Sequence, residues 1–463
     1  MKFISNTLDI AKFLDRKIKF NEVIKSISTD TRSLKKDSLF IAIKGKNFDG
    51  NDFVNDALAK GSNIVIADNK RFKNNKNKRI IYVNNSIKAL SKISNNIIKN
   101  YHGNVIAITG SNGKTTTTNI IGKTLKNNSK TLKNFNNEIG MPLSLMNASS
   151  DSKNLIFEIG ASKFKDIDYL SKILKPNIGL ITNIGNSHLE SLKNINGVFQ
   201  VKSEIVKNIK KNGFLIVPND NRKHLSAWRK MRSDITVISF GMNSDSDFYP
   251  TDIKIKSNGL SFLATSRLLE KTIKISSSLE GYHNIKNILS AFAVHYCLGQ
   301  NLQHFSKSIR ISKLDNLRQI KHKWLKGSTL IDDSYNANPD STKKSIDLLS
   351  NYNKKTVLLL GDMLELGTFK KKLHKEIGEY AKSKGINKLI AFGELTKHSI
   401  EAFGKNGIFF NDEAKLKDYL RKNITSKNVI LIKGSRGMKM ERFIDVWVFG
   451  NSFSFCWSWF WCS

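Results

Sequence analysis

The segment Val105-Ile-Ala-Ile-Thr-Gly-Ser-Asn-Gly-Lys-Thr-Thr116 is the most informative part of the chain. Four apolar residues in succession precede Thr109, and such a run is typical of a central parallel strand, which is buried on both faces. A glycine-containing turn follows, and the run from Asn119 to Leu125 is helix-like. The order strand, turn, helix predicts an α/β domain built around a parallel sheet.

The same segment predicts a phosphate site. Gly110 and Gly113 permit a turn in which backbone N–H groups point at an anion. Lys114 would reach the terminal phosphates of a nucleoside triphosphate, and the Thr115 hydroxyl would bind Mg²⁺. The usual loop of this kind has a further glycine where this chain has Ile108, so the short form is typical of a subgroup. The alternative is a chance Gly-Lys-Thr in a surface turn, which the flanking strand and helix patterns disfavour.

Length and composition indicate a multidomain globular protein. A chain of 463 residues exceeds one ordinary core, so we expect two to four domains. Hydrophobic residues make up 40% of the chain and charged residues 25%, as in a soluble globular protein. The net charge of +37 would suit nucleic acid, an acidic membrane surface or polyanionic substrates. Because the lysines are spread along the chain, we attribute the charge mainly to a composition bias that benefits anionic substrates.

Cysteine content and the N-terminus favour a cytoplasmic protein. Cys297, Cys456 and Cys462 form neither a disulfide framework nor a CxxC metal site. The first twenty residues carry charges throughout, so they predict neither a signal peptide nor a membrane span.

The last eighteen residues differ sharply from the rest. After Asp445 the chain reads VWVFGNSFSFCWSWFWCS, with four of the six tryptophans and no charged residue. Such a segment could lie at a membrane interface. Gly, Asn and Ser interrupt it, and it is short for a spanning helix. We therefore favour an altered reading frame or a non-native end over a membrane anchor.

Strand and helix patterns divide the chain into four parts. Residues 1–100 predict a small α/β domain, and residues 101–305 predict the central phosphate-binding domain with a parallel sheet. Residues 306–445 repeat the alternation in a Rossmann-like domain, and 446–463 form the atypical tail. The expected strands are 38–43 and 64–67 in the first part, 105–109, 155–159, 178–182 and 213–217 in the second, and 329–332, 356–360, 388–392 and 428–432 in the third.

Eight further motifs follow in a characteristic order. They are Asn134-Phe-Asn-Asn-Glu-Ile-Gly-Met-Pro142, Phe157-Glu-Ile-Gly-Ala161, Thr182-Asn-Ile-Gly-Asn-Ser-His-Leu189, Lys202-Ser-Glu-Ile205, Gly281-Tyr-His-Asn-Ile-Lys-Asn287, Asp332-Asp-Ser-Tyr-Asn-Ala-Asn-Pro339, Gly361-Asp-Met-Leu-Glu-Leu-Gly367 and Lys433-Gly-Ser-Arg-Gly-Met-Lys-Met-Glu441. Over roughly residues 25–445 the chain resembles the Mur ligases of peptidoglycan synthesis, and within them the branch that adds D-alanyl-D-alanine. The Asp-Asn-Pro-Arg motif typical of the preceding ligase, MurE, is absent.

The resemblance implies a two-metal centre. Phosphoryl transfer to a carboxylate brings two anions together, so cations must offset their repulsion. Glu158 and His188 come at the carboxyl ends of predicted parallel strands, where open α/β sheets place their ligands. By resemblance they hold a second Mg²⁺ besides the ion at Thr115. Imidazole is an unusual ligand for this hard cation, so chemistry alone supports His188 only as a polar site residue. The alternative for Glu158 is a strand-end carboxylate that caps a helix.

By resemblance, Lys202 carries a CO₂-derived carbamate that supports the metal site. The alternative is a solvated lysine on a helix, which the lysine-rich composition favours.

The resemblance also assigns contact residues. The residues expected to be catalytic are Lys114, Glu158, His188 and Lys202. Those expected to contact ATP are Gly110, Ser111, Asn112, Gly113, Lys114, Thr115, Thr116, Asn284, Arg318 and Asp333. Those expected to contact the other substrates are Ser28, Thr29, Asp30, Arg32, Asn137, Ser334, Asn336, Asn338 and Lys433, with Arg436 as a further anion partner. Relatives often carry His where this chain has Asn51, which leaves the uracil contacts open.

The implied function is ATP-dependent amide synthesis. The chain would add D-alanyl-D-alanine to a UDP-N-acetylmuramoyl-tripeptide through an acyl phosphate, as a cytoplasmic monomer without stable membrane insertion or nucleic acid. The alternatives are a MurE-like ligase, a folylpolyglutamate synthase, or a basic protein that binds nucleic acid and uses ATP as a switch. No recognition helix or RNA-stacking motif supports the last. The third peptide residue, lysine or diaminopimelate, stays open.

Overall fold

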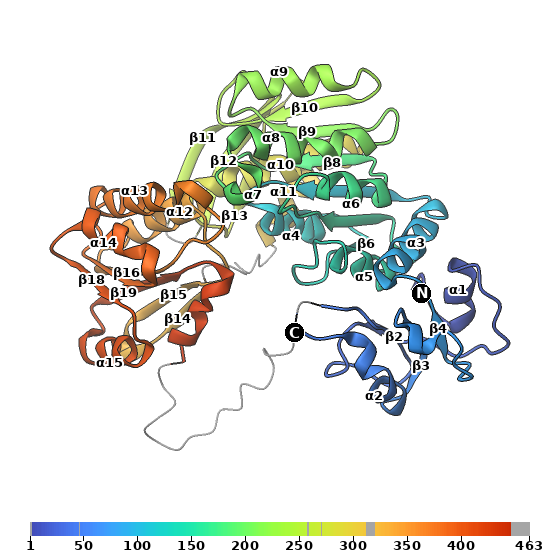
Figure 1. Ribbon diagram of the computed structural model, residues 1–463. Coiled ribbons are helices and arrows are strands. Elements are labelled where there is room, and N and C mark those ends of the chain that lie inside the picture. Colours follow the sequence, from blue (N-terminus) through green and yellow to red (C-terminus); the bar gives the residue numbers. More distant parts are fainter. Residues whose placement is uncertain (1, 46, 257–258, 270, 312–319, 446–463) are drawn as a thin grey trace.

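The computed structural model describes residues 2–45, 47–256, 259–269, 271–311 and 320–445. These residues form three β-sheets, each with its own helices, and Figure 1 shows the three parts in chain order from blue through green to red. The arrangement confirms the predicted α/β class with three domains. Within the described residues, no helix combines the length and apolar character that crossing a bilayer requires.

The N-terminal part is built on a parallel sheet in the order β1-β2-β3-β4. Its elements are α1 (Thr7–Phe13), β1 (Ser26–Ser28), β2 (Ser38–Ile41), the 3-10 helix η1 (Gly50–Phe53), α2 (Val54–Ala59), β3 (Ser62–Ala67), η2 (Lys70–Phe72) and β4 (Ile80–Tyr82). Because neighbouring strands are parallel, the loops that follow β1 and β2 leave the sheet at the same edge.

Helix α3 (Ser86–Lys99) connects the N-terminal and central parts. It packs against α1 on one side and against α5 and α6 of the central part on the other. Asn96 Nδ2 donates to the carbonyl of Phe13 at 3.0 Å, while Leu90, Ile93 and Ile97 are buried. The domain boundary at residue 100 therefore stays a prediction, because α3 contacts both sides.

The central part contains a mixed sheet in the order β13-β12-β11-β10-β9-β8-β5-β7-β6. From β6 to β11 all neighbours are parallel, and β11, β12 and β13 are antiparallel. Its elements are β5 (Asn104–Thr109), α4 (Lys114–Thr124), β6 (Asn128–Lys130), α5 (Gly140–Met146), β7 (Asn154–Glu158), α6 (Asp166–Leu174), β8 (Ile178–Ile181), α7 (Leu189–Leu192), α8 (Ile195–Ser203), η3 (Glu204–Asn208), β9 (Phe214–Pro218), α9 (Arg222–Met231), β10 (Thr236–Phe240), β11 (Phe248–Lys256), β12 (Gly259–Ser266), β13 (Ile273–Ser277), α10 (His283–Cys297) and α11 (Leu302–Ile311).

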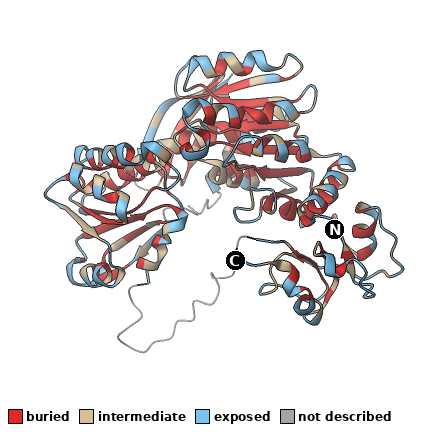
Figure 2. Ribbon diagram, in the orientation of Figure 1, coloured by how far each residue is buried: buried red, intermediate tan, exposed pale blue. Residues whose placement is uncertain are grey.

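Strand β5 lies between β8 and β7 in the central sheet and is buried on both faces. Figure 2 shows that the strands of the central part are mostly buried. Val105 and Ala107 belong to one apolar cluster, and Ile106 and Ile108 belong to the other. Successive side chains of a strand point to opposite faces, so an unbroken apolar run is what two buried faces require. This explains the pattern that predicted the strand.

The third part has a sheet in the order β14-β15-β19-β16-β17-β18, parallel except for the β14–β15 pair. Its elements are β14 (Ile320–Lys323), η4 (Leu325–Gly327), β15 (Thr329–Asp333), α12 (Pro339–Ser350), β16 (Lys355–Gly361), η5 (Gly367–Phe369), α13 (Lys370–Ser383), β17 (Lys388–Phe392), η6 (Glu394–Thr396), α14 (Lys397–Phe403), β18 (Gly407–Phe410), α15 (Glu413–Asn423), β19 (Asn428–Lys433), η7 (Arg436–Met438) and η8 (Met440–Phe443).

Candidate functional site

The loop between β5 and α4 has the predicted turn geometry. Gly110 and Gly113 both have positive φ, +141° and +83°. A Cβ on Gly110 would lie 2.0 Å from Thr182 Oγ1, so the position also lacks room for a side chain. Helix α4 begins directly at Lys114, five residues earlier than the predicted helix-like run. The loop therefore leads into a helix N-terminus, where backbone N–H groups and the helix dipole favour an anion.

The loop after β8 supports the phosphate loop through hydrogen bonds. Asn112 N donates to Asn183 Oδ1 at 2.8 Å, and Thr182 Oγ1 donates to the Asn112 carbonyl at 2.5 Å. Ser111 Oγ donates to the Gly185 carbonyl at 2.9 Å. These bonds fix the conformation of the turn before any ligand binds. Lys114 Nζ donates to the Gly110 carbonyl at 2.5 Å, so its ammonium group lies over the turn.

Thr115 and Glu158 bring oxygen atoms together beside the phosphate loop. Glu158 is the last residue of β7 and is 1% exposed. Thr115 Oγ1 donates to Glu158 Oε2 at 3.1 Å. A hydroxyl and a carboxylate are oxygen ligands that suit Mg²⁺, with phosphate oxygens and water completing the shell. Among the described residues, no group of three or more His, Cys, Asp or Glu could hold a metal by itself.

His188 contacts the third part rather than Glu158. It precedes α7 with φ +52°, and its Nδ1 lies 2.6 Å from Glu365 Oε2. The hydrogen bond from His188 lowers the pKa of Glu365 below its usual value. The sequence predicted His188 at a metal with Glu158, whereas here its Nδ1 is engaged by a carboxylate from the loop after β16. Its role as a metal ligand stays a prediction.

Lys202 lies in α8 and is 1% exposed, which excludes the solvated helix lysine considered as the alternative. Burial lowers the pKa of Lys202 to about 7, and the positive charge of Lys114 adds to the effect. An ammonium group in apolar surroundings is disfavoured, so the neutral amine is unusually accessible for a lysine.

Two cavities meet at the phosphate loop. The larger, of about 1000 Å³, is lined by Lys114, Thr115, Glu158 and His188 together with residues of the third part. The smaller, of about 430 Å³, is lined by Thr116 and by residues of α10 and α12. Asn112 and Gly113 line both cavities. One loop therefore separates two ligand-sized spaces.

The smaller cavity contains most of the residues predicted to contact the base and ribose. Asn284 lines it, with Nδ2 donating to the Glu280 carbonyl at 2.6 Å and Oδ1 accepting from Asn287 Nδ2 at 2.8 Å. His283 also lines it, and burial lowers the pKa of His283 to about 4. Arg318 lies outside the described residues.

Asp333 and Lys433 form a buried ion pair at the wall of the smaller cavity. Lys433 Nζ lies 2.6 Å from Asp333 Oδ2, and the side chains are 3% and 4% exposed. Ser345 Oγ donates to the same oxygen at 2.6 Å. The sequence assigned Lys433 to the peptide substrate, but its position beside Asp333 favours the cavity that Asn284 lines.

The residues predicted for the peptide substrate divide into two groups. Asn137, Asn336 and Asn338 line the larger cavity. Asn338 also caps α12. Ser334 does not line either cavity, because its backbone N and Oγ both donate to Asp332 Oδ1, at 3.0 and 2.6 Å.

The predicted uridine-diphosphate contacts lie at the edge of the first sheet. They are Ser28, Thr29, Asp30 and Arg32. Arg32 Nη2 lies 2.7 Å from Asp30 Oδ2, and Asp30 N donates to Ser28 Oγ at 3.0 Å. Asn51 is 1% exposed and bonds to Asp49 and Asp68, so it serves the fold of the loop rather than an open contact.

Sequence reasoning missed Glu365, Tyr335 and Asp340. All three line a cavity, and the first two lie in motifs quoted above without a role. For Glu365 and Tyr335 the motifs were the only available signal, and Asp340 comes directly after one of them. Nothing in the sequence states which distant loop each side chain will meet.

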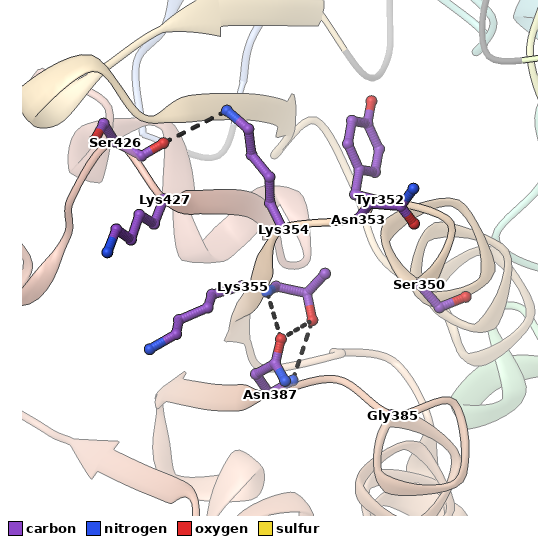
Figure 3. Close-up of a pocket in the computed structure, with 10 residues that line it drawn as sticks. Ser350, Tyr352, Asn353, Lys354, Lys355, Gly385, Asn387, Ser426 and Lys427 are labelled. Carbon is purple, nitrogen blue, oxygen red and sulfur yellow. Dashed lines mark hydrogen bonds between the residues drawn. The ribbon is translucent and has the colours of Figure 1, made fainter.

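A further hollow, of about 730 Å³, lies at the amino ends of β16, β17 and β19. Figure 3 shows Lys354 reaching the Ser426 carbonyl, while the side chains of Lys355 and Lys427 extend in other directions. Asn387 Oδ1 accepts from Thr356 N at 2.8 Å, so its amide serves the sheet. Ligands of open α/β sheets bind at the carboxyl ends of the strands, and we assign this hollow no role.

Three family models match the chain. The model "Mur ligase family, catalytic domain" matches residues 23–102, "Mur ligase middle domain" matches 108–295, and "Mur ligase, glutamate ligase domain" matches 318–436.

Curated relatives and solved structures agree with these matches. The UDP-N-acetylmuramoyl-tripeptide–D-alanyl-D-alanine ligase of Buchnera aphidicola subsp. Baizongia pistaciae is 37% identical, over 91% of this chain and 92% of the relative. The Bacillus subtilis protein of the same name is 33% identical, over 91% and 93%. MurF of Acinetobacter baumannii superposes with a TM-score of 0.84 at 26% identity, over 95% and 97%. MurF of Thermotoga maritima in complex with ADP gives 0.78 at 27%, over 91% and 96%.

Proposed function

The chain belongs to the Mur ligase family, and from this premise we propose that it joins D-alanyl-D-alanine to a UDP-N-acetylmuramoyl-tripeptide at the expense of ATP, in peptidoglycan precursor synthesis. The observation that carries the proposal is the pair of cavities that share one phosphate loop. A nucleotide in the smaller cavity would direct its terminal phosphate to the loop. The peptide carboxylate would approach from the larger cavity.

The first step activates the carboxylate. A carboxylate oxygen of the tripeptide attacks the γ-phosphorus, the bond from that phosphorus to the β–γ bridging oxygen breaks, and ADP leaves. The product is an acyl phosphate. The Lys114 ammonium group and the N-terminus of α4 oppose the repulsion between the two anions, and they act most strongly where charge develops on the transferring group.

The second step forms the amide. The amino group of D-alanyl-D-alanine attacks the acyl carbon and loses a proton, and the tetrahedral intermediate collapses as the carbon–oxygen bond to phosphate breaks. Contacts of the third part with the loop after β8, such as His188 with Glu365, enclose the larger cavity. Such enclosure keeps water from the acyl phosphate.

The chemistry of Thr115 and Glu158 fits one Mg²⁺, which would supply positive charge against the β- and γ-phosphate oxygens. Because Glu365 engages Nδ1 of His188, this residue would hold a second ion through Nε2. Lys202 would carry a carbamate that orients the metal site, and its burial and lowered pKa support this assignment. We further propose a cytoplasmic monomer that binds no nucleic acid.

An ADP-release assay across a panel of UDP-N-acetylmuramoyl-peptides tests the function. We expect ADP release only when a tripeptide substrate and D-alanyl-D-alanine are both present, with Lys114→Ala as the inactive control. Release with a dipeptide substrate and a single amino acid would instead identify a MurE-like ligase. Tight oligonucleotide binding without ligase activity would favour the nucleic-acid alternative. Comparing ADP release between tripeptide substrates with lysine and with diaminopimelate at the third position identifies the third peptide residue, which the sequence left open.

A further inference from the structure

The third part presents two opposite charges to the larger cavity. Among the described residues of this part that line it, Arg436 is the one cation and Glu365 the one carboxylate. Resting on the proposed function, we propose that Arg436 binds the carboxylate of the incoming D-alanyl-D-alanine and that Glu365 binds its ammonium group. The third part would thus recognise the dipeptide as a zwitterion and set its direction in the cavity.

The two charges stand on loops that touch each other. Leu364 N donates to Ser435 Oγ at 2.8 Å, which joins the loop after β16 to the loop after β19. A Cβ on Gly437 would lie 2.9 Å from Leu364 Cδ1, so the loops are also in van der Waals contact. Arg436 and Glu365 therefore flank a short stretch that contains the half-exposed apolar side chain of Leu364. An extended dipeptide spans about 7 Å, and its methyl groups suit such a surface.

Arg436 is held in place before substrate arrives. Its Nη1 lies 2.8 Å from Glu441 Oε1, a carboxylate that is 16% exposed, and its backbone N donates to Asn336 Oδ1 at 3.3 Å. A guanidinium group has five N–H donors, so one contact with Glu441 leaves others for a substrate carboxylate. Such prior positioning reduces the entropy lost on binding.

Glu365 is held by residues that follow β8, and the loop after β8 also bonds to the phosphate loop. Its carboxylate contacts His188, and its carbonyl accepts from Glu190 N at 3.1 Å. An ammonium group bound there would share the cavity with Thr115 and Glu158, which also line it. The other lining cations, such as Lys88 and Lys163, come from α3 and the central part and suit the carboxylates of the UDP-peptide.

The test of the carboxylate contact compares D-alanyl-D-alanine with its C-terminal amide, in the wild type and in Arg436→Gln. We expect the wild type to prefer the free acid, and Arg436→Gln to lose that preference as its KM for the free acid rises about 10- to 100-fold. KM for ATP and for the UDP-tripeptide should stay within about twofold, which also shows that the variant folds. Lys372→Gln, which removes an exposed cation on α13 outside both cavities, is the matched control.

Glu365→Gln tests the ammonium contact. Its KM for the dipeptide should rise, while its preference for the free acid over the amide stays, because that preference belongs to Arg436. The inference would be overturned if Arg436→Gln kept the wild-type preference for the free acid over the amide. An unchanged KM for the dipeptide in Glu365→Gln would also overturn it. Failure of the wild type to use D-alanyl-D-alanine at all would instead overturn the proposed function.

Discussion

Asn112 in the phosphate loop and Asn338 at the start of α12 are joined by two side-chain hydrogen bonds. Asn338 Nδ2 donates to Asn112 Oδ1 at 2.9 Å, and Asn112 Nδ2 donates to Asn338 Oδ1 at 3.3 Å. Close by, Asp340 Oδ2 accepts from the backbone N–H of Asn186 at 2.8 Å. The third part therefore contacts both the phosphate loop and the loop after β8 that supports it. Docking of the third part is coupled to the conformation of both loops.

Replacing Asn338 by serine tests this coupling. Serine is a good N-cap, so α12 should keep its start while the bonds to Asn112 are lost. We expect affinity for ADP, measured by calorimetric titration, to fall about 3- to 10-fold, as for the loss of one or two hydrogen bonds. Thermal stability should change little. Asn338→Ala removes the cap as well and should destabilise by about 0.5–2 kcal/mol. Wild-type ADP affinity in both variants would show that the amide pair carries no coupling.

The sequence predicted the strands that are buried on both faces. Runs such as Val105–Ile108 suit a central strand, because both of its faces are buried and successive side chains must be apolar. It did not predict β11, β12 and β13, where one face is partly exposed and buried residues alternate with less buried ones along β12. This alternation gives a weaker signal than a continuous run.

The sequence identified individual residues of the candidate site but not which of them contact one another. Short motifs identified Thr115, Glu158 and Lys202 as chemical groups. The contact of His188 with Glu365 and that of Asp333 with Lys433 join segments far apart in the chain. The first contact follows from how the domains dock, and the second from the pairing of β15 with β19. Local propensity encodes neither. The burial of Lys202 likewise depends on tertiary packing, so composition wrongly favoured a solvated lysine.

His295 should make stability fall in mild acid. It lies 2% exposed in α10, with Nε2 2.9 Å from Thr124 Oγ1, and burial lowers its pKa to about 4. The unfolded state, with a pKa near 6.5, binds a proton between about pH 6.5 and 4 that the folded state does not. Stability from this group is therefore complete above about pH 6.5 and is lost as pH falls toward 4.

The comparison of wild type with His295→Gln isolates this effect. Urea denaturation gives the unfolding free energy of each protein. From pH 7 to pH 5 the wild type should lose about 2 kcal/mol more of this free energy than His295→Gln does. A pH-independent difference would show that His295 titrates normally.

Truncation at two positions tests where the third part ends. Phe443 is fully buried, with its ring centroid 5.0 Å from that of Phe392, and Trp324 Nε1 donates to the Ile444 carbonyl at 2.9 Å. Removal of residues 446–463 should leave ADP binding and thermal stability close to those of the full chain. Removal of residues 443–463 also deletes Phe443 and should cost about 3–5 kcal/mol. Equal destabilisation by both truncations would assign the aromatic tail a structural role.

Lys202 gives the most demanding prediction, because it concerns a covalent modification. Carbamate formation needs the free amine, and a lysine with an ordinary pKa near 10.4 has well under ~0.1% of it at pH 7. Burial and the charge of Lys114 lower the pKa of Lys202 to about 7, so the amine fraction is large near neutrality and falls as pH drops below about 7. The carbamate, once formed, replaces a cation that repels metal ions with an anion that attracts them.

Lys202→Ala should therefore lose most ligase activity, and short carboxylic acids should restore part of it by occupying the place of the carbamate. Lys202→Arg keeps the positive charge but cannot be carbamylated, so it should be inactive and insensitive to added acids. Mass spectrometry under bicarbonate, together with activity in CO₂-depleted buffer, would follow the modification directly in the wild type. If Lys202→Arg were as active as the wild type, the buried amine would serve packing alone, and the metal site would need no carbamate.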